Sequence, residues 1–456
     1  MKRRTFLEKA SLAVTAAIAV PTIIPAACVG KNGQTPPSDK INLAMIGAGN
    51  QAGNDVMDFL NDDRVVITLI CDVNKKSDGY WDGRVAGREY IRDIVNGFYT
   101  RKYERRYRAC TDVEDFREVI SRKDIDAVEI ATPDHWHAIP VLMAAAAKKD
   151  IYCQKPLSLT IAEGRAMSDA VRHHNVIFQT GSQQRSNHNF RRICELVRNG
   201  RIGQLETVIC GLPSGTPDFG QKAHLTDLAP VPDGFNYELW LGPAPFAPYA
   251  PCRTHVNFRW ILDYSGGQLT DWGGHHPDIA QWGMDTELTG PINIRNATSK
   301  WAEHPHYNTA TDFYFECFYE NGVKLIVKSG SDFGVTFIGT EGKVWSDRGK
   351  HTVEPESLQD VVIGRGDVQL YQSDNHFRNF IDCVISRKEP IAPVEVAHRS
   401  ITIAHLGNIA MMLNKDLEWD PKTERVLNVP EANDMLSRPM REPWDAVYKE
   451  YLVKPL

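Results

Sequence analysis

The sequence predicts an α/β protein, in which a doubly wound parallel sheet is followed by an α+β domain with a large, mainly antiparallel, open-faced sheet. Short apolar runs alternate with helical segments as far as residue 180, which is the pattern of parallel strands joined by crossover helices. The alternation then stops, and later strand patterns are joined by turns such as Glu320-Asn321-Gly322, where Asn-Gly favours a tight hairpin. The length of 456 residues also exceeds what one ordinary core needs.

The first predicted domain covers residues 40–180. Its strands are expected at 41–46, 65–71, 126–131, 151–153 and 176–179, and its helices at 54–60, 138–148 and 161–173. A glycine-rich turn at 47–53 separates the first strand from the first helix. Strands and helices in this order predict a parallel sheet covered on both faces.

The second predicted domain covers residues 181–456. A helix is expected at 189–199, where Gly200 ends it, and further helices are expected at 376–386 and 398–413. Strands are expected at 313–319, 323–327, 335–338 and 343–345, in two hairpins. The Pro-rich tail from Pro439 is expected to pack in order over the surface.

Residues 1–30 have the pattern of an export signal, and 31–39 form a polar linker. Arg3 and Arg4 precede an Ala-rich apolar stretch, which is typical of the twin-arginine signal that carries folded proteins across a membrane. Pro21 and Pro25 leave that stretch short of the roughly 20 residues that span a bilayer, so no transmembrane span is expected. We therefore expect a periplasmic protein, and Cys28 is a candidate for a lipid anchor because Ala26-Ala27 precede it.

Composition and charge exclude several classes of partner. The chain has 42% hydrophobic and 24% charged residues, and 52 basic against 58 acidic residues give a net charge of −6 without a long like-charge block. Nothing in this balance indicates nucleic acid or an acidic membrane as the partner. The eight cysteines after Cys28 stand singly and favour buried free thiols, because they lie in apolar segments.

The segment Gly47-Ala48-Gly49-Asn50-Gln51-Ala52-Gly53 predicts a dinucleotide site. It lies directly between a strand and a helix, so Gly47 permits the tight turn and Gly49 lets the backbone approach a pyrophosphate at the helix N-terminus. Asp72 closes the next strand and would accept hydrogen bonds from ribose hydroxyls while repelling a 2′-phosphate, which favours NAD over NADP. The alternative is that Asp72 only forms a turn.

Two more motifs lie at the ends of neighbouring strands. The segment 131–137 offers Thr132, Asp134, His135, Trp136 and His137, and the next strand ends in Gln154-Lys155-Pro156. Loops at the carboxyl ends of a doubly wound sheet hold the ligand, so we expect these residues to line the nicotinamide half of the cleft. A fourth motif, 266–278, contains Asp271, Gly273, His275 and Asp278.

Together these motifs resemble the family that includes glucose-fructose oxidoreductase, inositol dehydrogenase and the MocA-type proteins. The resemblance rests on the dinucleotide turn, Thr132-Pro133 with His137, the pair Lys155-Pro156 and the 266–278 signature. It implies the two-domain layout, NAD as cofactor and Lys155, Asp271 and His275 as the catalytic set. The family segment usually reads Glu-Lys-Pro, and Gln154 is an amide in place of that acid.

The chemistry of these three side chains agrees with the resemblance. Oxidising a secondary alcohol requires a group that takes the hydroxyl proton and a cation that stabilises the developing alkoxide. His275 is suited to the first task and Lys155 to the second, and Asp271 would orient the imidazole. Gly273 and Gly274 make a helix between 271 and 275 unfavourable, so a loop is expected to bring them together.

Simpler interpretations exist for some of these residues. His275 or His276 could only begin the helix that Pro277 enters. A zinc site is disfavoured because the histidines and acids of the motifs have no compact ligand spacing, so no metal is expected. Sugar contacts are expected from polar and aromatic residues beside the motifs, namely Arg185, Arg259, Trp260, Tyr264 and His276.

The sequence thus favours an NAD-dependent oxidoreductase acting on a ring hydroxyl of a sugar or glycoside, at carbon three, with a tightly held cofactor. The alternative is an NAD-dependent glycosidase that oxidises carbon three transiently and eliminates the leaving group. A non-enzymatic binding protein is disfavoured because Lys155, Asp271 and His275 are all present. The open-faced second sheet favours a homo-oligomer, a dimer or tetramer.

Overall fold

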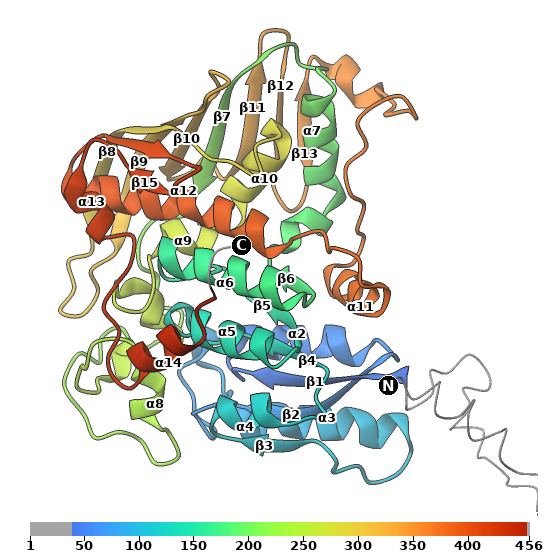
Figure 1. Cartoon of the computed structure of the whole chain (residues 1–456), viewed down its shortest axis with the longest axis vertical. Helices are drawn as coiled ribbons and strands as arrows, with labels where there is room; N and C mark the ends of the chain where they lie inside the picture. Colours follow the sequence, from blue (N-terminus) through green and yellow to red (C-terminus); the bar gives the residue numbers. More distant parts are fainter. Residues whose placement is uncertain (1–38, 454–456) are drawn as a thin grey trace, which may run out of the picture. The chain divides into compact units, whose positions relative to one another are not determined.

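In the computed structural model, which describes residues 39–453, the first half of the chain forms a six-stranded parallel sheet (Figure 1). The spatial order is β3-β2-β1-β4-β5-β6, so the order reverses between β1 and β4, where doubly wound sheets bind ligands. The strands are β1 (Ile41–Ile46), β2 (Val65–Cys71), β3 (Thr111–Val113), β4 (Ala127–Ile130), β5 (Asp150–Cys153) and β6 (Phe178–Thr180).

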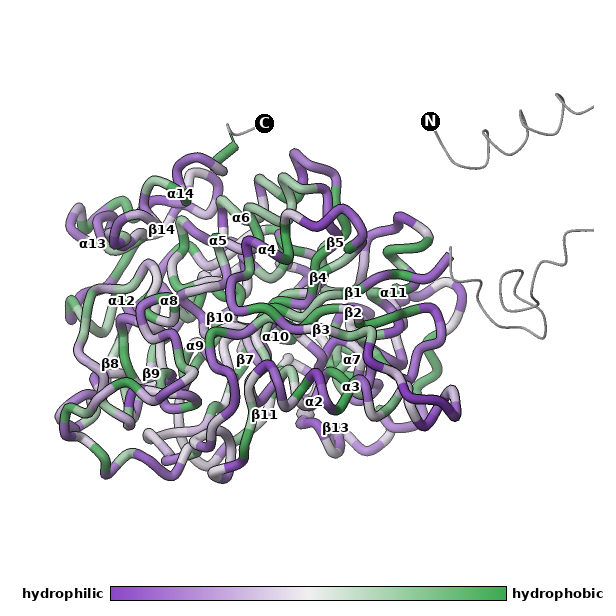
Figure 2. Tube along the Cα trace, turned by 90° about the horizontal axis from the view of Figure 1, so that it is seen from below, coloured by the Kyte–Doolittle hydropathy of each residue, from purple (hydrophilic) through white to green (hydrophobic). Residues whose placement is uncertain are grey.

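Helices cover both faces of this sheet. Successive side chains of β1 point to opposite faces, and the apolar residues on each face pack against helices. Leu43 and Met45 pack with α2 (Asn50–Leu60), α3 (Arg88–Lys102) and α11 (His376–Ser386). Ala44 and Ile46 share a core with α4 (Phe116–Ser121), α5 (Ala138–Ala146) and α6 (Ile161–His174). The central strands are accordingly apolar (Figure 2), and α11 packs here although it comes from the second half of the sequence.

The second half forms a nine-stranded mixed sheet in the order β13-β12-β11-β7-β10-β9-β8-β14-β15. Its only parallel pair among the described strands is β7 with β10, so the sheet is mainly antiparallel and the predicted fold class is confirmed. The strands are β7 (Leu205–Leu212), β8 (Asn293–Trp301), β9 (Ala310–Phe318), β10 (Lys324–Ser329), β11 (Gly334–Gly339), β12 (Lys343–Ser346), β13 (His351–Glu354), β14 (Leu417–Asp420) and β15 (Arg425–Val426).

One face of this second sheet is covered by α7 (His188–Arg198), α10 (His276–Met284) and α12 (Val394–Leu413). In β9 the buried Phe313, Phe315 and Cys317 belong to the core with these helices, whereas the alternating Tyr314 and Glu316 are only half-buried. The face with the half-buried residues is the one expected to support a homo-oligomer, which stays a prediction. The remaining helices are α8 (Tyr237–Leu241), α9 (Gln268–Gly273), α13 (Pro430–Asp434) and α14 (Trp444–Glu450), with short 3₁₀ turns between elements.

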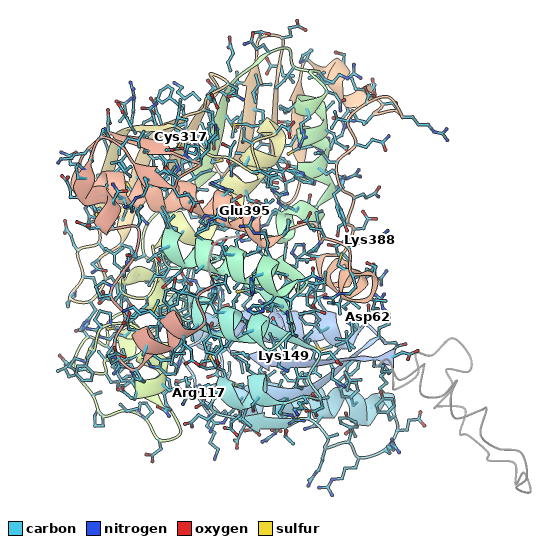
Figure 3. All side chains as sticks on the ribbon, in the orientation of Figure 1. Asp62, Arg117, Lys149, Cys317, Lys388 and Glu395 are labelled. Atoms are coloured by element: carbon cyan, nitrogen blue, oxygen red, sulfur yellow. The ribbon has the colours of Figure 1, made fainter. Side chains whose placement is uncertain are left out.

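Helices α6 and α12 join the two halves of the fold. Arg165 of α6 donates two hydrogen bonds to Glu395 of α12, labelled in Figure 3, and two more to Glu424 beyond β14. The tail from Pro439 also bridges the halves, because Trp444 packs edge-on against Trp136 of the first domain. The predicted ordered tail is therefore confirmed as far as residue 453.

Several elements depart from the sequence-based expectation. Helix α2 begins at Asn50, inside the predicted turn, because the extended backbone of Gly49 already caps it. The sequence did not predict α3, which is mostly polar and buries only Ile91, Val95 and Tyr99. The predicted export signal, the linker up to Ser38 and the candidate anchor Cys28 lie outside the described residues.

Membrane-spanning helices and disulfides are both absent from the described part of the chain, residues 39–453. None of its helices combines the length and the apolar character that crossing a membrane requires. Its eight cysteines are all buried and unbridged, as the apolar context of their segments predicted; Cys317 is labelled in Figure 3.

Candidate active site

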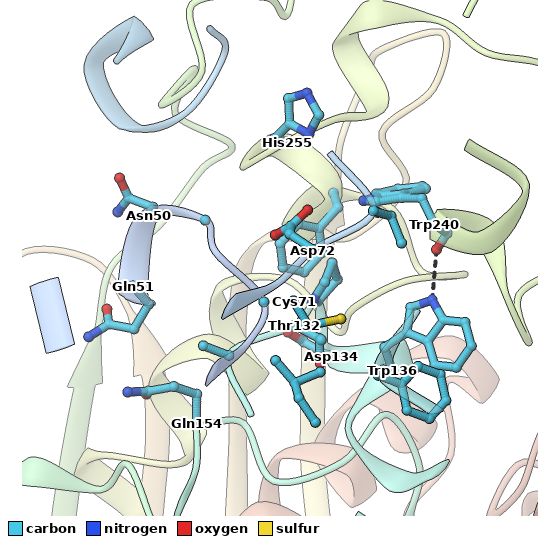
Figure 4. A pocket seen from close by; sticks show the side chains of 18 of the residues that line it. Asn50, Gln51, Cys71, Asp72, Thr132, Asp134, Trp136, Gln154, Trp240 and His255 are labelled. Carbon is cyan, nitrogen blue, oxygen red and sulfur yellow. Dashed lines mark hydrogen bonds between the residues drawn. The ribbon is translucent and has the colours of Figure 1, made fainter. Parts of the chain in front are cut away.

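A cleft opens at the carboxyl ends of β1, β2, β4 and β5, where the strand order reverses. Ten of the predicted cofactor residues line it, as Figure 4 shows for several of them. These ten are Gly47, Gly49, Asn50, Gln51, Asp72, Thr132, Asp134, Trp136, Gln154 and Lys155. The second half of the chain adds a wall formed by the predicted Arg259 and by five residues that no motif indicated, Leu239, Trp240, His255, Val256 and Phe258.

The glycine turn fits a dinucleotide on structural grounds. Gly47 has a φ of +96°, and a Cβ there would lie 2.6 Å from the carbonyl carbon of Ala131, so only glycine allows β1 and β4 to approach so closely. A Cβ on Gly49 would lie 3.1 Å from the ring of Tyr80. The hydroxyl of Thr132 is buried in the cleft wall and has no hydrogen-bond partner, which leaves it for a ligand.

Asp72 is held at the far end of the glycine turn. Its carboxylate accepts hydrogen bonds from the backbone N–H groups of Ala48 (2.6 Å) and Asn74 (2.7 Å), and it lines the cleft. Two amide donors fix its orientation while lone pairs remain for further donors, such as ribose hydroxyls. Burial raises the pKa of Asp72, an effect that these amides partly offset.

Lys155 joins the first domain to the second. Its Nζ donates to Asp271 Oδ1 at 2.9 Å and to the Asp271 carbonyl at 3.2 Å, and Arg259 Nε approaches the same carboxylate oxygen at 3.4 Å. Burial alone would raise the pKa of Asp271, but attraction to Lys155 and then Arg259 lowers it to about 2. Two cations therefore share one carboxylate at the end of the cleft.

Gly274 packs against Lys155, which brings the next residue, His275, close to the Lys155–Asp271 pair. A Cβ on Gly274 would lie 3.1 Å from Cβ of Lys155, and Ser182 Oγ donates to the Gly274 carbonyl at 2.9 Å. The expected break before His275 is confirmed, because helix α9 ends at Gly273 and residues 274–275 form a turn; Asp271 itself lies in α9, a helix that the sequence did not predict. Gly273 is the last residue of that helix. A Cβ there would lie 2.7 Å from Cβ of Ala404, so the glycine permits close packing of α9 on α12.

His275 is a buried, neutral imidazole. Burial lowers its pKa well below the ordinary value, and the positive charges of Lys155 and Arg348 lower it further. Its ring is 4% exposed and its Nδ1 has no hydrogen-bond partner. The prediction that Asp271 orients this imidazole is wrong, because Asp271 instead pairs with Lys155 and Arg259.

Family models match both halves of the chain. The model for the NAD-binding Rossmann fold of the oxidoreductase family matches residues 41–182, and the model for its C-terminal alpha/beta domain matches 187–446. The chain belongs to the Gfo/Idh/MocA oxidoreductase family. Its first domain is the NAD-binding domain of that family, and the predicted family resemblance is confirmed.

Relatives and solved structures agree with the family assignment. The uncharacterized oxidoreductase YrbE of Bacillus subtilis is 28% identical over 55% of this chain and 63% of its own length, so the match spans less than two thirds of that relative. A scyllo-inositol 2-dehydrogenase (NAD(+)) of the same organism is 25% identical over 61% of this chain and 73% of its own. The aldose-aldose oxidoreductase structure from Caulobacter crescentus has a TM-score of 0.55 at 17% identity, over 83% of this chain and 99% of that one, and shows a similar fold.

The structure explains why Gln154 differs from the usual glutamate of the Gfo/Idh/MocA segment. Its amide Nε2 donates to Asp55 at 2.5 Å, and Gln51 Nε2 donates to the other oxygen of Asp55 at 2.7 Å. Asp55 in turn faces Glu129, and both carboxyls are almost fully buried. A glutamate at 154 would add a third carboxyl to this pair, whereas the amide supplies a donor.

Two predicted cofactor residues of the Gfo/Idh/MocA cleft need correction. His135 and His137 do not line it, because their rings are 2% and 1% exposed and point to backbone carbonyls. His135 Nε2 contacts the Trp240 carbonyl, which also accepts from Trp136 Nε1 (dashed in Figure 4). His137 lies between the carbonyls of Thr132 and Pro156, so it ties two strand-end loops together.

Three predicted sugar contacts are also corrected. Arg185 is 2% exposed, and its guanidinium is paired with Asp278 at 2.6 Å and Glu287 at 2.7 Å. Trp260 and Tyr264 are completely buried, and Trp260 donates its ring N–H to a backbone carbonyl. Arg185 and Trp260 stabilise the second domain because their polar groups are paired within the protein, whereas the buried hydroxyl of Tyr264 has no hydrogen-bond partner.

The other predicted sugar contacts stay predictions with partial support. Arg259 lines the cleft, and His276 keeps an unpartnered Nε2 while its Nδ1 contacts the Gly211 carbonyl at 2.9 Å.

Among residues 39–453 no group of three or more metal-ligand side chains is arranged around one point. Sequence reasoning missed Arg348, whose guanidinium lies over Trp272, the ring that also neighbours His275, because it comes from a hairpin turn with no motif.

The buried acid pair predicts an unusual pH dependence of stability. Burial raises the pKa of Asp55 to about 6 and that of Glu129 well above its ordinary range. The folded protein therefore keeps protons that the unfolded chain releases above pH ~4, so the free energy of unfolding should fall as the pH rises from about 4, up to about 6 for Asp55 and further for Glu129. Glu129→Gln should reduce that fall by up to about 1.4 kcal/mol per pH unit, measured by urea unfolding between pH 5 and 8.

The matched control is Glu418→Gln, which changes an exposed glutamate of β14 and should leave the pH profile unchanged. Parallel stability profiles for the wild type and Glu129→Gln would mean that the pair does not hold an extra proton.

Proposed function

We propose that this member of the Gfo/Idh/MocA family is an NAD-dependent dehydrogenase that oxidises a ring hydroxyl of a sugar or glycoside, at carbon three. The observation that carries the proposal is that Lys155, which lines the dinucleotide cleft, contacts Asp271 and acts electrostatically on the buried His275. A cation and a neutral imidazole at one point are the two groups that alcohol oxidation requires.

In this proposal each side chain has a defined task. His275, neutral because of burial and nearby cations, accepts the proton of the substrate hydroxyl. Lys155 stabilises the alkoxide that develops, and Asp271 holds the Lys155 ammonium in position. Bound NAD supplies the acceptor for the hydride that leaves the substrate carbon.

The names of two relatives support the choice of substrate class. One relative is named as an NAD(+)-dependent dehydrogenase of scyllo-inositol, and one structural neighbour as an aldose-aldose oxidoreductase. Both names refer to polyhydroxylated compounds, as the proposal requires for this chain.

We also propose that the cofactor is retained between turnovers. His255 of the second half stacks on Tyr80 of the first, with ring centroids 4.6 Å apart, and both line the cleft. Trp240 and Phe258 add apolar surface to the same wall. A cofactor enclosed by both halves would leave slowly, so a second substrate would reoxidise it in place.

Lys155→Ala tests the proposed chemistry. Loss of the ammonium should lower the rate of nicotinamide reduction by glycosides at least about 100-fold, because the alkoxide loses its stabilising charge. The rate is measured from the reduced-nicotinamide absorbance band, and dinucleotide content and thermal unfolding show that the variant is folded and loaded.

Lys148→Ala is the matched control, because this exposed lysine lies outside the cleft and donates to the His174 carbonyl. An active Lys155→Ala variant would refute the assignment. Release of a chromogenic aglycone without net nicotinamide reduction would favour the glycosidase that transiently oxidises carbon three.

We further propose that the protein is exported to the periplasm by the twin-arginine route, with Cys28 as a candidate lipid anchor. The proposal rests on Arg3 and Arg4 followed by an apolar stretch. Changing both arginines to lysine should leave most of the protein in the cytoplasm, measured by cell fractionation and immunoblotting. The change Lys9→Gln should not affect the distribution, and unchanged export of the double variant would contradict the proposal.

A further inference from the structure

Arg348 presents a guanidinium at the substrate end of the site. It lies in the turn between β12 and β13, and its guanidinium carbon lies 4.7 Å from the ring centroid of Trp272 in α9. Asn187, at the start of α7, donates to the Arg348 carbonyl at 3.1 Å and so anchors the turn. Arg348 is exposed at the surface; the protein packed against its guanidinium lowers its pKa, and attraction to Asp271 opposes that effect.

Two unpartnered imidazole nitrogens lie around the same tryptophan. His275 and His276 have ring centroids 5.5 and 5.3 Å from that of Trp272. His275 Nδ1 and His276 Nε2 have no hydrogen-bond partner, although the side chains are 4% and 0% exposed. Buried polar atoms are rarely left without partners, so the two nitrogens have hydrogen-bonding capacity that hydroxyl groups of a ligand can use.

The protonation of His276 indicates what its free nitrogen can do. Burial lowers the pKa of His276 to about 4, so the ring is neutral at pH 7. Its Nδ1 faces the Gly211 carbonyl and must donate, which leaves Nε2 as an acceptor. That acceptor matches a sugar hydroxyl and is unsuited to an anion.

Positive charge exceeds negative charge at this end of the site. Lys155 and Arg259 share the single carboxylate of Asp271, which leaves one net positive charge. Within residues 39–453 no acidic side chain forms an ion pair with Arg348, so it adds a second, which the Asp347 carboxylate near His276 partly offsets. The pKa of Asp134, which also lines the cleft, is raised by burial to about 7, so its carboxyl is only partly ionised at pH 7 and offsets only part of this positive charge.

The acid next to Arg348 in the sequence is already engaged. The Asp347 carboxylate accepts hydrogen bonds from the backbone N–H groups of Gly349 (2.7 Å) and Lys350 (2.9 Å), which close the turn. The Arg348 guanidinium is therefore a planar cation that stacks on the Trp272 ring on one side and has N–H donors free for a planar anion.

We propose that the substrate is an acidic sugar, a hexuronate or its glycoside, whose carboxylate is bound by Arg348 while Lys155 and His275 hold the reacting hydroxyl. The proposal rests on the dehydrogenase function proposed above and specifies its substrate class. A single guanidinium binds a carboxylate by two parallel hydrogen bonds. We favour a carboxylate over a doubly charged phosphate because Lys155 is assigned to the reacting hydroxyl, and the neutral His275 and His276 add no further cation to Arg348.

Matched pairs of ligands test this proposal. Methyl glucosides and galactosides are compared with the corresponding methyl uronides, which differ from them at carbon six, by calorimetric titration of the NADH-loaded protein. In at least one pair the uronide should bind 10-fold or more tightly than the neutral glycoside. Arg348→Gln should remove most of that preference, and Arg348→Lys should retain part of it because the charge remains without the fork.

Lys350→Gln is the control, because this second cation of the same turn lies over Trp345 and not over Trp272. It should keep the uronide preference. Neutral glycosides that bind as tightly as their uronides, an absence of uronide binding, or a preference that survives Arg348→Gln would each overturn the proposal.

The titration also separates this proposal from the dehydrogenase function. Binding is measured without turnover, and the reduced-nicotinamide absorbance band is recorded separately with the NAD-loaded protein. A uronide preference without nicotinamide reduction would contradict the dehydrogenase and uphold the acidic ligand. Reduction by neutral glycosides alone would uphold the dehydrogenase and contradict the acidic substrate.

Discussion

The contact between the Lys155 ammonium and the Asp271 carboxylate is the interaction on which the rest of the site depends. It joins the loop after β5 of the first domain to helix α9 of the second at a distance of 2.9 Å. Both side chains are largely buried, so either charge alone would carry a large desolvation cost. The two domains are thereby held in the one arrangement in which cation, carboxylate and cofactor cleft coincide.

Close backbone packing places the neighbouring groups around this pair. Gly274 packs tightly against Lys155, and Gly273 lets α9 lie on α12, so the residue that follows, His275, is buried close to Lys155. Burial and the nearby cations keep that imidazole neutral. A neutral acceptor beside a fixed positive charge requires little reorganisation when an alcohol loses its proton.

Much of the fold and part of the site could be predicted from local sequence patterns. The glycine turn, Asp72 and Lys155 were found because each lies at the end of an apolar strand, and the order of the strands determines where such ends meet. The partner of Asp271 was assigned wrongly, since spacing along the chain pointed to His275 and the actual partner lies 116 residues away. The buried roles of Arg185 and Tyr264 likewise depend on contacts that no periodicity reveals.

The central claim is that Lys155 and His275 converge on one substrate hydroxyl beside the cofactor. A crystal structure of the protein with NADH and a bound sugar ligand tests this most directly. The account predicts one ring hydroxyl within about 2.6–3.2 Å of both the Lys155 Nζ and the His275 imidazole, with its carbon facing the nicotinamide. A ligand whose hydroxyls contact neither group, with the nicotinamide outside the cleft lined by Gly47 and Thr132, would contradict the account.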